Sequence, residues 1–155
     1  CLVDVRAFPA SRRHPQFARE ALERSLPAAG IRYVWEGKAL GGRRKPAGDS
    51  LHVALRNPSF RAYADHMGTE EFREGVERLI ALGRTKRAAV MCAERLPWQC
   101  HRFLISDYLV AGGGKVAHLV NAGASRDHRL NPVVRLRDGN LAYDGETQGE
   151  FKLEE

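Results

Sequence analysis

The chain has 155 residues, of which 43% are hydrophobic and 28% are charged, with 25 Lys and Arg against 19 Asp and Glu and a net charge of +6. This length suits one compact domain with its own core, and no apolar run approaches the ~20 residues that cross a bilayer, so neither a transmembrane segment nor a membrane partner is expected. The positive charge fits an anionic partner such as a phosphate, a nucleotide or a nucleic acid, and it fits a solvated Arg-rich surface equally well.

The chain contains three cysteines, an odd number at unmatched spacings. A chain of this length needs no disulfide framework to be stable. We therefore expect free thiols in a reducing compartment, and a cytoplasmic protein.

The first half of the chain alternates strand and helix patterns. The apolar, β-branched run at residues 2–5 predicts a buried strand. Apolar residues then recur at helical spacing from Pro15 to Gly30 and predict a helix, which a second strand follows at residues 31–35. A strand–helix–strand unit of this length favours a parallel pair. Residues 36–58 are rich in Gly, Pro and basic residues and predict a long loop that is functional or disordered.

The second half continues the alternation. The patterns predict helices at residues 57–67, 69–82 and 100–111 and strands at residues 88–92 and 116–120. Asp138-Gly139 is a turn signal that joins two short strands, 133–136 and 140–143, into a hairpin. Residues 146–155 are predicted to form a frayed tail.

Alternating strands and helices predict an α/β fold. We expect a single domain over residues 1–145, with a mainly parallel sheet flanked by helices and a small C-terminal β-hairpin. Ligands of parallel sheets bind beyond the carboxyl ends of the strands. This rule places candidate sites at residues 4–13, 92–102 and 121–130.

The segment from Cys92 to Arg102 holds the densest group of reactive side chains. It leaves a predicted strand and enters a predicted helix, whose N-terminus favours anions and thiolates. Glu94 would orient His101 or accept a proton itself. The candidate catalytic residues are Cys92, Glu94, Cys100 and His101. The alternative interpretation is structural, with Cys92 as inert core and Arg102 paired to Glu94.

Three sharper interpretations of this segment are a zinc site, a redox pair and a phosphatase or rhodanese loop. Zinc needs about four ligands, commonly in Cys-x₂₋₄-Cys pairs. Cys92 and Cys100 are further apart in the sequence than such pairs are. We therefore predict no cofactor, and zinc remains an alternative. The Cys-x-x-Cys spacing of a redox pair is absent. A phosphatase or rhodanese loop resembles this topology, but such loops carry Arg six positions after the cysteine, where this chain has Trp98.

Basic side chains gather at the other two predicted strand ends. The fork of an Arg guanidinium suits phosphate or carboxylate. The candidate anion-binding residues are Arg6, Ser11, Arg12, Arg102 and His128. Residues 40–45, which are rich in Gly and Arg, would close over a bound anion. The alternative interpretations are a basic surface loop and a solvated histidine.

Several motifs, taken in order, resemble one known family. They are Asp4-Val-Arg6-x-x-Pro9-x-Ser11-Arg12, Leu40-Gly-Gly42, Arg56-Asn-Pro-Ser-Phe60 with Tyr63, Cys92-Ala-Glu94-x-x-Pro97-x-x-Cys100-His101-Arg102, and His128-Arg-Leu130. Over about residues 2–135 the chain resembles the domain of unknown function 488 family. The resemblance implies a small bacterial or archaeal α/β protein and brings no settled activity. Members usually begin with a strand that carries a Thr-Ile-Gly-His/Tyr-Ser type segment and a helix, so we expect that an upstream segment is missing from this chain.

The sequence is compatible with three functions. The leading hypothesis is an enzyme that acts on a small phosphorylated or nucleotide-like anion, with Cys100 as the nucleophile and Arg6, Arg12 and Arg102 as anion ligands. The alternatives are a nucleic-acid-binding module that uses the Arg-rich loops and a cysteine-based metal or redox sensor.

Overall fold

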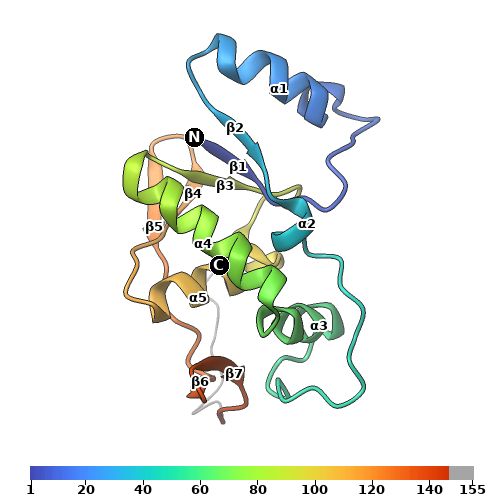
Figure 1. The fold of residues 1–155 in the computed structure, drawn as a ribbon, viewed down its shortest axis with the longest axis vertical. Helices are drawn as coiled ribbons and strands as arrows, with labels where there is room; N and C mark the ends of the chain where they lie inside the picture. Colours follow the sequence, from blue (N-terminus) through green and yellow to red (C-terminus); the bar gives the residue numbers. More distant parts are fainter. Residues whose placement is uncertain (147–155) are drawn as a thin grey trace.

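A three-stranded parallel sheet positions the candidate site in the computed structural model, which describes residues 1–146. Its strands are β1 (Leu2–Asp4), β2 (Tyr33–Trp35) and β3 (Ala89–Met91), in the order β2-β1-β3 (Figure 1). The register pairs Asp4 of the central strand with Trp35 on one side and Met91 on the other. The carboxyl ends of the three strands therefore meet at one edge, which is where ligands of parallel sheets bind.

The helices lie between and after the three strands in the sequence. They are α1 (Arg19–Ala28), α2 (Gly37–Leu40), α3 (Pro58–Met67), α4 (Glu70–Thr85) and α5 (Arg102–Ala111), with short 3₁₀ turns at Pro15–Phe17 and Pro97–Gln99. The start of α3 follows from its sequence, because the Asn57 side chain accepts from the Ser59 N–H and Pro58 takes the first helical position. The Thr69 hydroxyl caps α4 in the same way.

The core lies where α3, α4 and α5 pack beside the sheet. Val3 and Val5 of the central chain are fully buried, as are Tyr63 of α3 and Phe72 of α4. The aromatic rings of Tyr63 and Phe72 meet edge to face with their centres 6.1 Å apart. None of the helices within residues 1–146 is long and apolar enough to cross a membrane.

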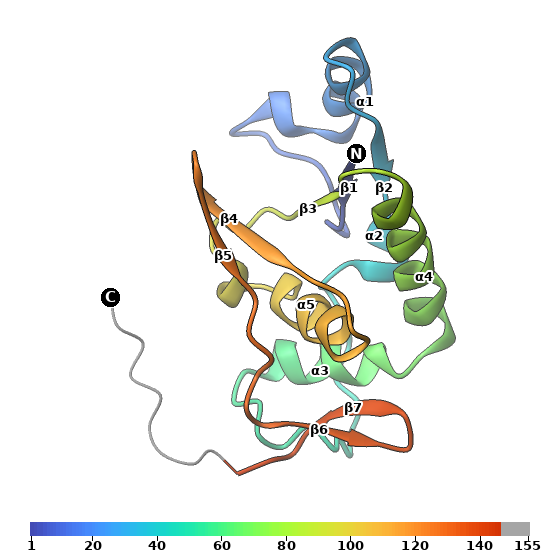
Figure 2. The same ribbon diagram turned by 90° about the vertical axis from the view of Figure 1, so that its left-hand side faces the viewer.

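Two antiparallel hairpins complete the described chain. They are β4 (Ala117–Asn121) with β5 (Ala124–Asp127), and β6 (Val134–Arg137) with β7 (Asn140–Tyr143). The second confirms the predicted C-terminal hairpin, with Asp138 and Gly139 at φ values of 49° and 79°, as a tight two-residue turn requires. It lies next to α3, at the opposite end of the molecule from α1 (Figures 1 and 2).

The fold is α/β as predicted, but only part of its sheet structure is parallel. Residues 116–120 were expected to continue the alternating pattern, whereas β4 pairs antiparallel with β5, a strand that the sequence interpretation missed. Gly123, at φ +76°, reverses the chain directly after β4. The third predicted site, residues 121–130, therefore does not lie at the parallel edge.

Two smaller differences concern segments without periodicity. The expected loop at residues 36–58 contains α2, which is too short to show helical spacing. Of the predicted frayed tail, residues 147–155 lie outside the described part of the chain.

Candidate functional site

A pocket of about 560 Å³ opens at the carboxyl edge of the parallel sheet. Its walls come from the segments that follow β1 and β3, from the loop after α2 and from the chain that enters α5. The predicted site residues that line it are Arg6, Ser11, Cys92, Glu94, Cys100 and His101. Two of the segments predicted to follow strand ends, residues 4–13 and 92–102, thus contribute side chains to the same pocket although they lie far apart in the sequence.

Arg6 is fixed in the pocket wall by a buried carboxylate. Asp4, fully buried, accepts from Arg6 Nε at 2.8 Å and Nη2 at 2.6 Å, and the Tyr33 hydroxyl donates to the same carboxylate at 2.6 Å. The two residues can pair because positions i and i+2 of an extended chain share a face. The hydrogen bond to Asp4 raises the pKa of Arg6, so the guanidinium stays charged and holds one orientation beside the pocket.

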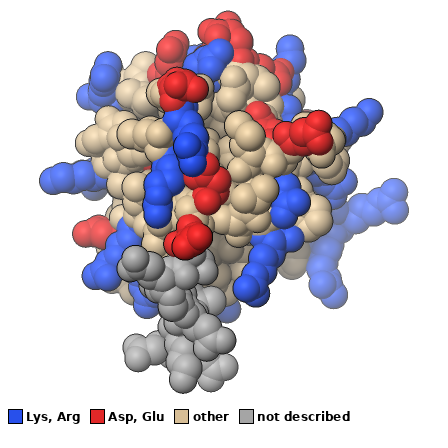
Figure 3. Space-filling model, turned by 90° about the horizontal axis from the view of Figure 1, so that it is seen from below, with Lys and Arg blue, Asp and Glu red and all other residues tan. Residues whose placement is uncertain are grey.

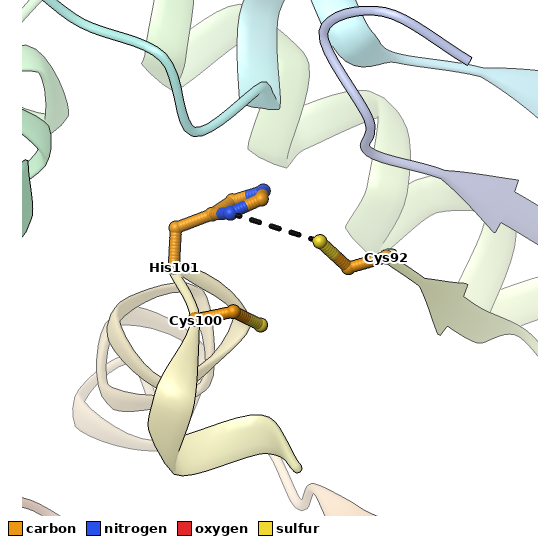
Figure 4. Close-up of side chains that lie close together, drawn as sticks. All are labelled: Cys92, Cys100 and His101. Atoms are coloured by element: carbon orange, nitrogen blue, oxygen red, sulfur yellow. Dashed lines mark hydrogen bonds between the residues drawn. The ribbon is translucent and has the colours of Figure 1, made fainter. Parts of the chain in front are cut away.

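His101 is oriented by the main chain. Its Nε2 lies 3.2 Å from the Val5 carbonyl oxygen, which only accepts, so Nε2 carries a proton. This leaves Nδ1 facing the Cys92 sulfur at 4.0 Å (Figure 4). The backbone of Gly42 lies against the imidazole so closely that any Cβ there would overlap the ring. The expected orienting role of Glu94 is therefore taken by Val5, and the exposed Glu94 side chain lines the pocket instead.

Cys92 and Cys100 form a coupled pair of thiols. Cys92 directly follows β3 and Cys100 precedes α5. Their sulfurs and one His101 ring nitrogen all lie within 4.8 Å of one another (Figure 4). A hydrogen bond from the Cys92 thiol, opposed by burial and aided by Arg102, lowers the pKa of Cys100 to about 6. The same hydrogen bond, together with burial, raises the pKa of Cys92 to about 12. Cys100 is thus the thiolate and Cys92 the thiol of the pair.

Arg102 supports this thiolate and does not line the pocket. Its Nε donates to Cys100 Sγ at 3.0 Å, and its Nη2 donates to the backbone carbonyls of Glu94 and Arg95, the latter at 3.4 Å. The sequence suggested a pair between Arg102 and the Glu94 carboxylate, whereas the contact is to the Glu94 main chain. Arg102 therefore positions the turn and favours the charged sulfur.

The remaining predicted anion ligands lie elsewhere. Arg12 is exposed and is not among the residues that line the pocket. Arg43, which belongs to the Gly- and Arg-rich segment at residues 40–45, does line it, with its guanidinium carbon 5.5 Å from the centre of the Phe8 ring. The Gly- and Arg-rich composition of residues 40–45 predicted an anion-binding loop. It could not show which of the three basic residues in that loop, Arg43, Arg44 or Lys45, lines the pocket.

His128 belongs to a separate buried network. Its Nε2 lies 2.8 Å from the Asp107 carboxylate and its Nδ1 lies 2.8 Å from His118 Nε2. Asp107 also accepts from the Tyr143 hydroxyl and the Asn131 N–H, both at 2.9 Å. The structure thus places His128 outside the pocket, in a cluster that ties α5 to both hairpin segments.

The fold and the site together define a small α/β protein with two cysteines and an imidazole in a pocket at the carboxyl edge of a parallel sheet. The chain belongs to the family described as Domain of unknown function DUF488, whose profile matches residues 1–109. The match includes every pocket-lining residue and ends before β4. Neither the curated proteins nor the solved structures contain a match to this chain.

Proposed function

We propose that this protein is an enzyme that acts on a small phosphorylated or nucleotide-like anion, with Cys100 as its nucleophile. The observation that carries the proposal is the position of the Cys100 sulfur. It accepts a hydrogen bond from Arg102 Nε at 3.0 Å and lines the same pocket as the Arg6 and Arg43 guanidinium groups. A stabilised sulfur anion beside fixed positive charge suits attack on an anionic electrophile.

Three side chains of the pocket, those of Arg6, Arg43 and Ser11, would bind the anion in different ways. Arg6 is clamped by Asp4, so it offers a preorganised charge that loses little conformational entropy on binding. Arg43 is exposed at the rim and can follow the ligand as it enters. The Ser11 oxygen accepts from the His14 N–H at 3.0 Å, which leaves its own proton available for an anion oxygen.

The covalent step joins Cys100 Sγ to the electrophilic phosphorus or carbon of the substrate. As that bond forms, the bond to the leaving group breaks, and its electron pair departs with the leaving group. Glu94 lines the pocket and is the carboxyl group that can transfer a proton there. Water then cleaves the enzyme–substrate bond, and His101 Nδ1, held toward the thiols, can accept the proton of that water.

Thiol alkylation with protection by anions tests this proposal. Metal-free protein is treated with iodoacetamide near neutral pH, and each modified cysteine is identified by mass spectrometry. Cys100 is expected to react faster than Cys1, and millimolar inorganic phosphate or a nucleoside monophosphate is expected to slow only Cys100. In Arg43→Gln the protection falls at least about tenfold, since one charged ligand is lost, whereas Arg12→Gln, outside the pocket, is the matched control.

Two outcomes would contradict the proposal. One is a Cys100 that reacts no faster than Cys1, and the other is a reaction rate that neither phosphate nor nucleotide changes. A screen of phosphate esters then follows, with Cys100→Ser as the inactive control.

Nucleic acid binding has less support from the described surface. On the face shown in Figure 3, Lys and Arg are interspersed with Asp and Glu, without a continuous basic patch among the described residues in view. Binding of nucleic acid through backbone phosphates would fall steeply with added salt, so a salt series on a single-stranded oligonucleotide separates this alternative from a pocket ligand.

A further inference from the structure

Cys92, Cys100 and His101 offer the donor atoms that zinc prefers. Zinc in proteins is bound chiefly by Cys sulfur and His nitrogen. Seven residues separate the two cysteines in the sequence, a spacing that argues against a local zinc motif. The turn between β3 and α5 nevertheless brings both sulfurs and an imidazole nitrogen within 4.8 Å of one another. Within residues 1–146 no other group of three His, Cys, Asp or Glu residues meets in this way.

The separations are close to those of a tetrahedral centre. Zinc binds sulfur at about 2.3 Å and nitrogen at about 2.0 Å, so two ligands of a tetrahedral ion lie about 3.8 Å apart for two sulfurs and about 3.5 Å apart for sulfur and nitrogen. The Cys92 sulfur and His101 Nδ1 are 4.0 Å apart. The other two separations are no longer than 4.8 Å, so the three donor atoms lie within about 1 Å of the spacing that zinc ligands have.

The surroundings of the group are those of a ligand set. A histidine that binds metal through one nitrogen usually donates its other N–H to a carbonyl or carboxylate, as His101 Nε2 does to Val5. Cys100 Sγ accepts from Arg102 Nε at 3.0 Å, which favours the thiolate that a metal requires. The backbone at Gly42 closes over the imidazole and restricts its rotation.

We infer that Cys92, Cys100 and His101 form a zinc-binding site with three protein ligands and a fourth position open to the pocket. The three ligands all line that pocket, so a water molecule or an oxygen of an anion can complete the tetrahedron from the side of Arg6. This inference goes beyond the proposed function, because a zinc-bound Cys100 is no longer a free nucleophile. Zinc loading and thiol reactivity are alternative states of the same side chains.

Cobalt substitution tests the site without any substrate. Chelator-treated protein is titrated with Co²⁺ under reducing, anaerobic conditions, and the visible absorption and near-ultraviolet charge transfer are recorded. We expect one equivalent of Co²⁺ to give the intense visible bands of a tetrahedral ion and charge transfer from two thiolates. Stoichiometric Zn²⁺ is expected to bleach both signals. A wild-type protein that gives no thiolate charge transfer overturns the inference.

Matched cysteine variants assign the ligands. Cys92→Ser and Cys100→Ser should each lose about half of the charge transfer and weaken zinc binding at least about tenfold, since one of three ligands is lost. Cys1→Ser, which changes the remaining free cysteine, should leave both measurements unchanged. If Cys1→Ser alone removes the signal, or if neither Cys92→Ser nor Cys100→Ser changes it, the assignment is wrong. Should a serine variant fold poorly, protection of Cys92 and Cys100 from alkylation by Zn²⁺ in the wild-type chain gives the same answer.

These measurements separate the two proposals. Failure to bind Co²⁺ or Zn²⁺ leaves the anion-protected reactivity of Cys100 to be judged by itself. Conversely, if the protein binds zinc but phosphate and nucleotide do not change the alkylation rate of Cys100, the metal site stands and the proposed enzymatic function is wrong.

Discussion

Two buried carboxylates, Asp4 and Asp107, anchor two different regions of this molecule. Each is fully buried, and each accepts from a tyrosine hydroxyl and from a basic side chain. The partner of Asp4 is Arg6, which lines the pocket, whereas the partner of Asp107 is His128, which does not. The same chemistry thus prepares a side chain for a ligand in one region and joins secondary structure elements in the other.

The two histidines make the difference between these regions explicit. Both ring nitrogens of His128 meet a protein partner at 2.8 Å. His101 has one nitrogen on the Val5 carbonyl and presents the other to two thiols in the pocket. A buried histidine whose second nitrogen faces reactive groups and a cavity is the better candidate for function. Residue type and position in the sequence could not distinguish His101, which lines the pocket, from His128, which does not.

The largest effect should come from breaking the Asp107 network. In Asp107→Ala the Tyr143 hydroxyl, His128 and the Asn131 N–H lose their buried acceptor, so the free energy of unfolding should fall by about 3–5 kcal/mol. Urea denaturation measures it, with the exposed Asp127→Ala as a control expected to stay within about 0.5 kcal/mol of the wild type. A loss for Asp107→Ala as small as that of the control would show that this network does not stabilise the fold.

A glycine substitution beside the pocket should act more locally. The Cβ of Gly42→Ala would overlap the His101 ring, and overpacking of this kind costs about 1–3 kcal/mol. Alkylation of Cys100 should change with it, because the imidazole must move. Gly48→Ala is the control, since a Cβ there meets no atom within 4 Å. Equal stabilities for the two variants would contradict the tight fit of the loop on His101.

The pH dependence of Cys100 should distinguish the pocket thiolate from an ordinary thiol. Its pKa of about 6 means that the thiolate is present above that pH and is lost as the pH falls through it. Allowing for the lower nucleophilicity of a weakly basic thiolate, Cys100 should react about tenfold faster at pH 6.5 than a thiol of ordinary pKa. The alkylation rate of metal-free protein from pH 5 to 9 measures this, with Cys1 as internal reference. Arg102→Gln should move the midpoint upward, and an unchanged midpoint would exclude Arg102 as one of the groups that stabilise the thiolate.

The smallest effect is expected at the edge of the Asp107 network. His118 is half-buried and contributes one hydrogen bond to His128, so His118→Gln should cost about 1 kcal/mol in urea denaturation. The alkylation rate of Cys100 should not change. A slower Cys100 in this variant would mean that the two regions are coupled.

The parts of the fold that could be predicted are those with a local signal. The apolar runs before Asp4 and Cys92 gave β1 and β3, and the rule for strand ends then placed their polar residues at one edge. Asp138-Gly139 specified its hairpin because both positions require positive φ. The caps at Asn57 and Thr69 set the starts of α3 and α4.

The parts that could not be predicted depend on contacts distant in sequence. The strand β5 is exposed on both faces, so it shows no alternation of apolar and polar residues. Arg102 sits within the predicted anion cluster, yet its side chain turns back to Cys100, a choice that only the packed turn decides. The partner of His101 is a backbone oxygen of Val5, and main-chain acceptors carry no residue-type signal at all.

The contact between His101 and the main-chain carbonyl of Val5 also affects which mutations the site can tolerate. Val5 is linked to both sides of the pocket, since its N–H donates to the Met91 carbonyl at 3.0 Å while its own carbonyl receives His101. Any residue at position 5 that keeps the extended backbone supplies the same acceptor. A saturation library at this position would therefore vary core packing while the imidazole keeps its tautomer, which makes it a site where stability can be engineered separately from chemistry.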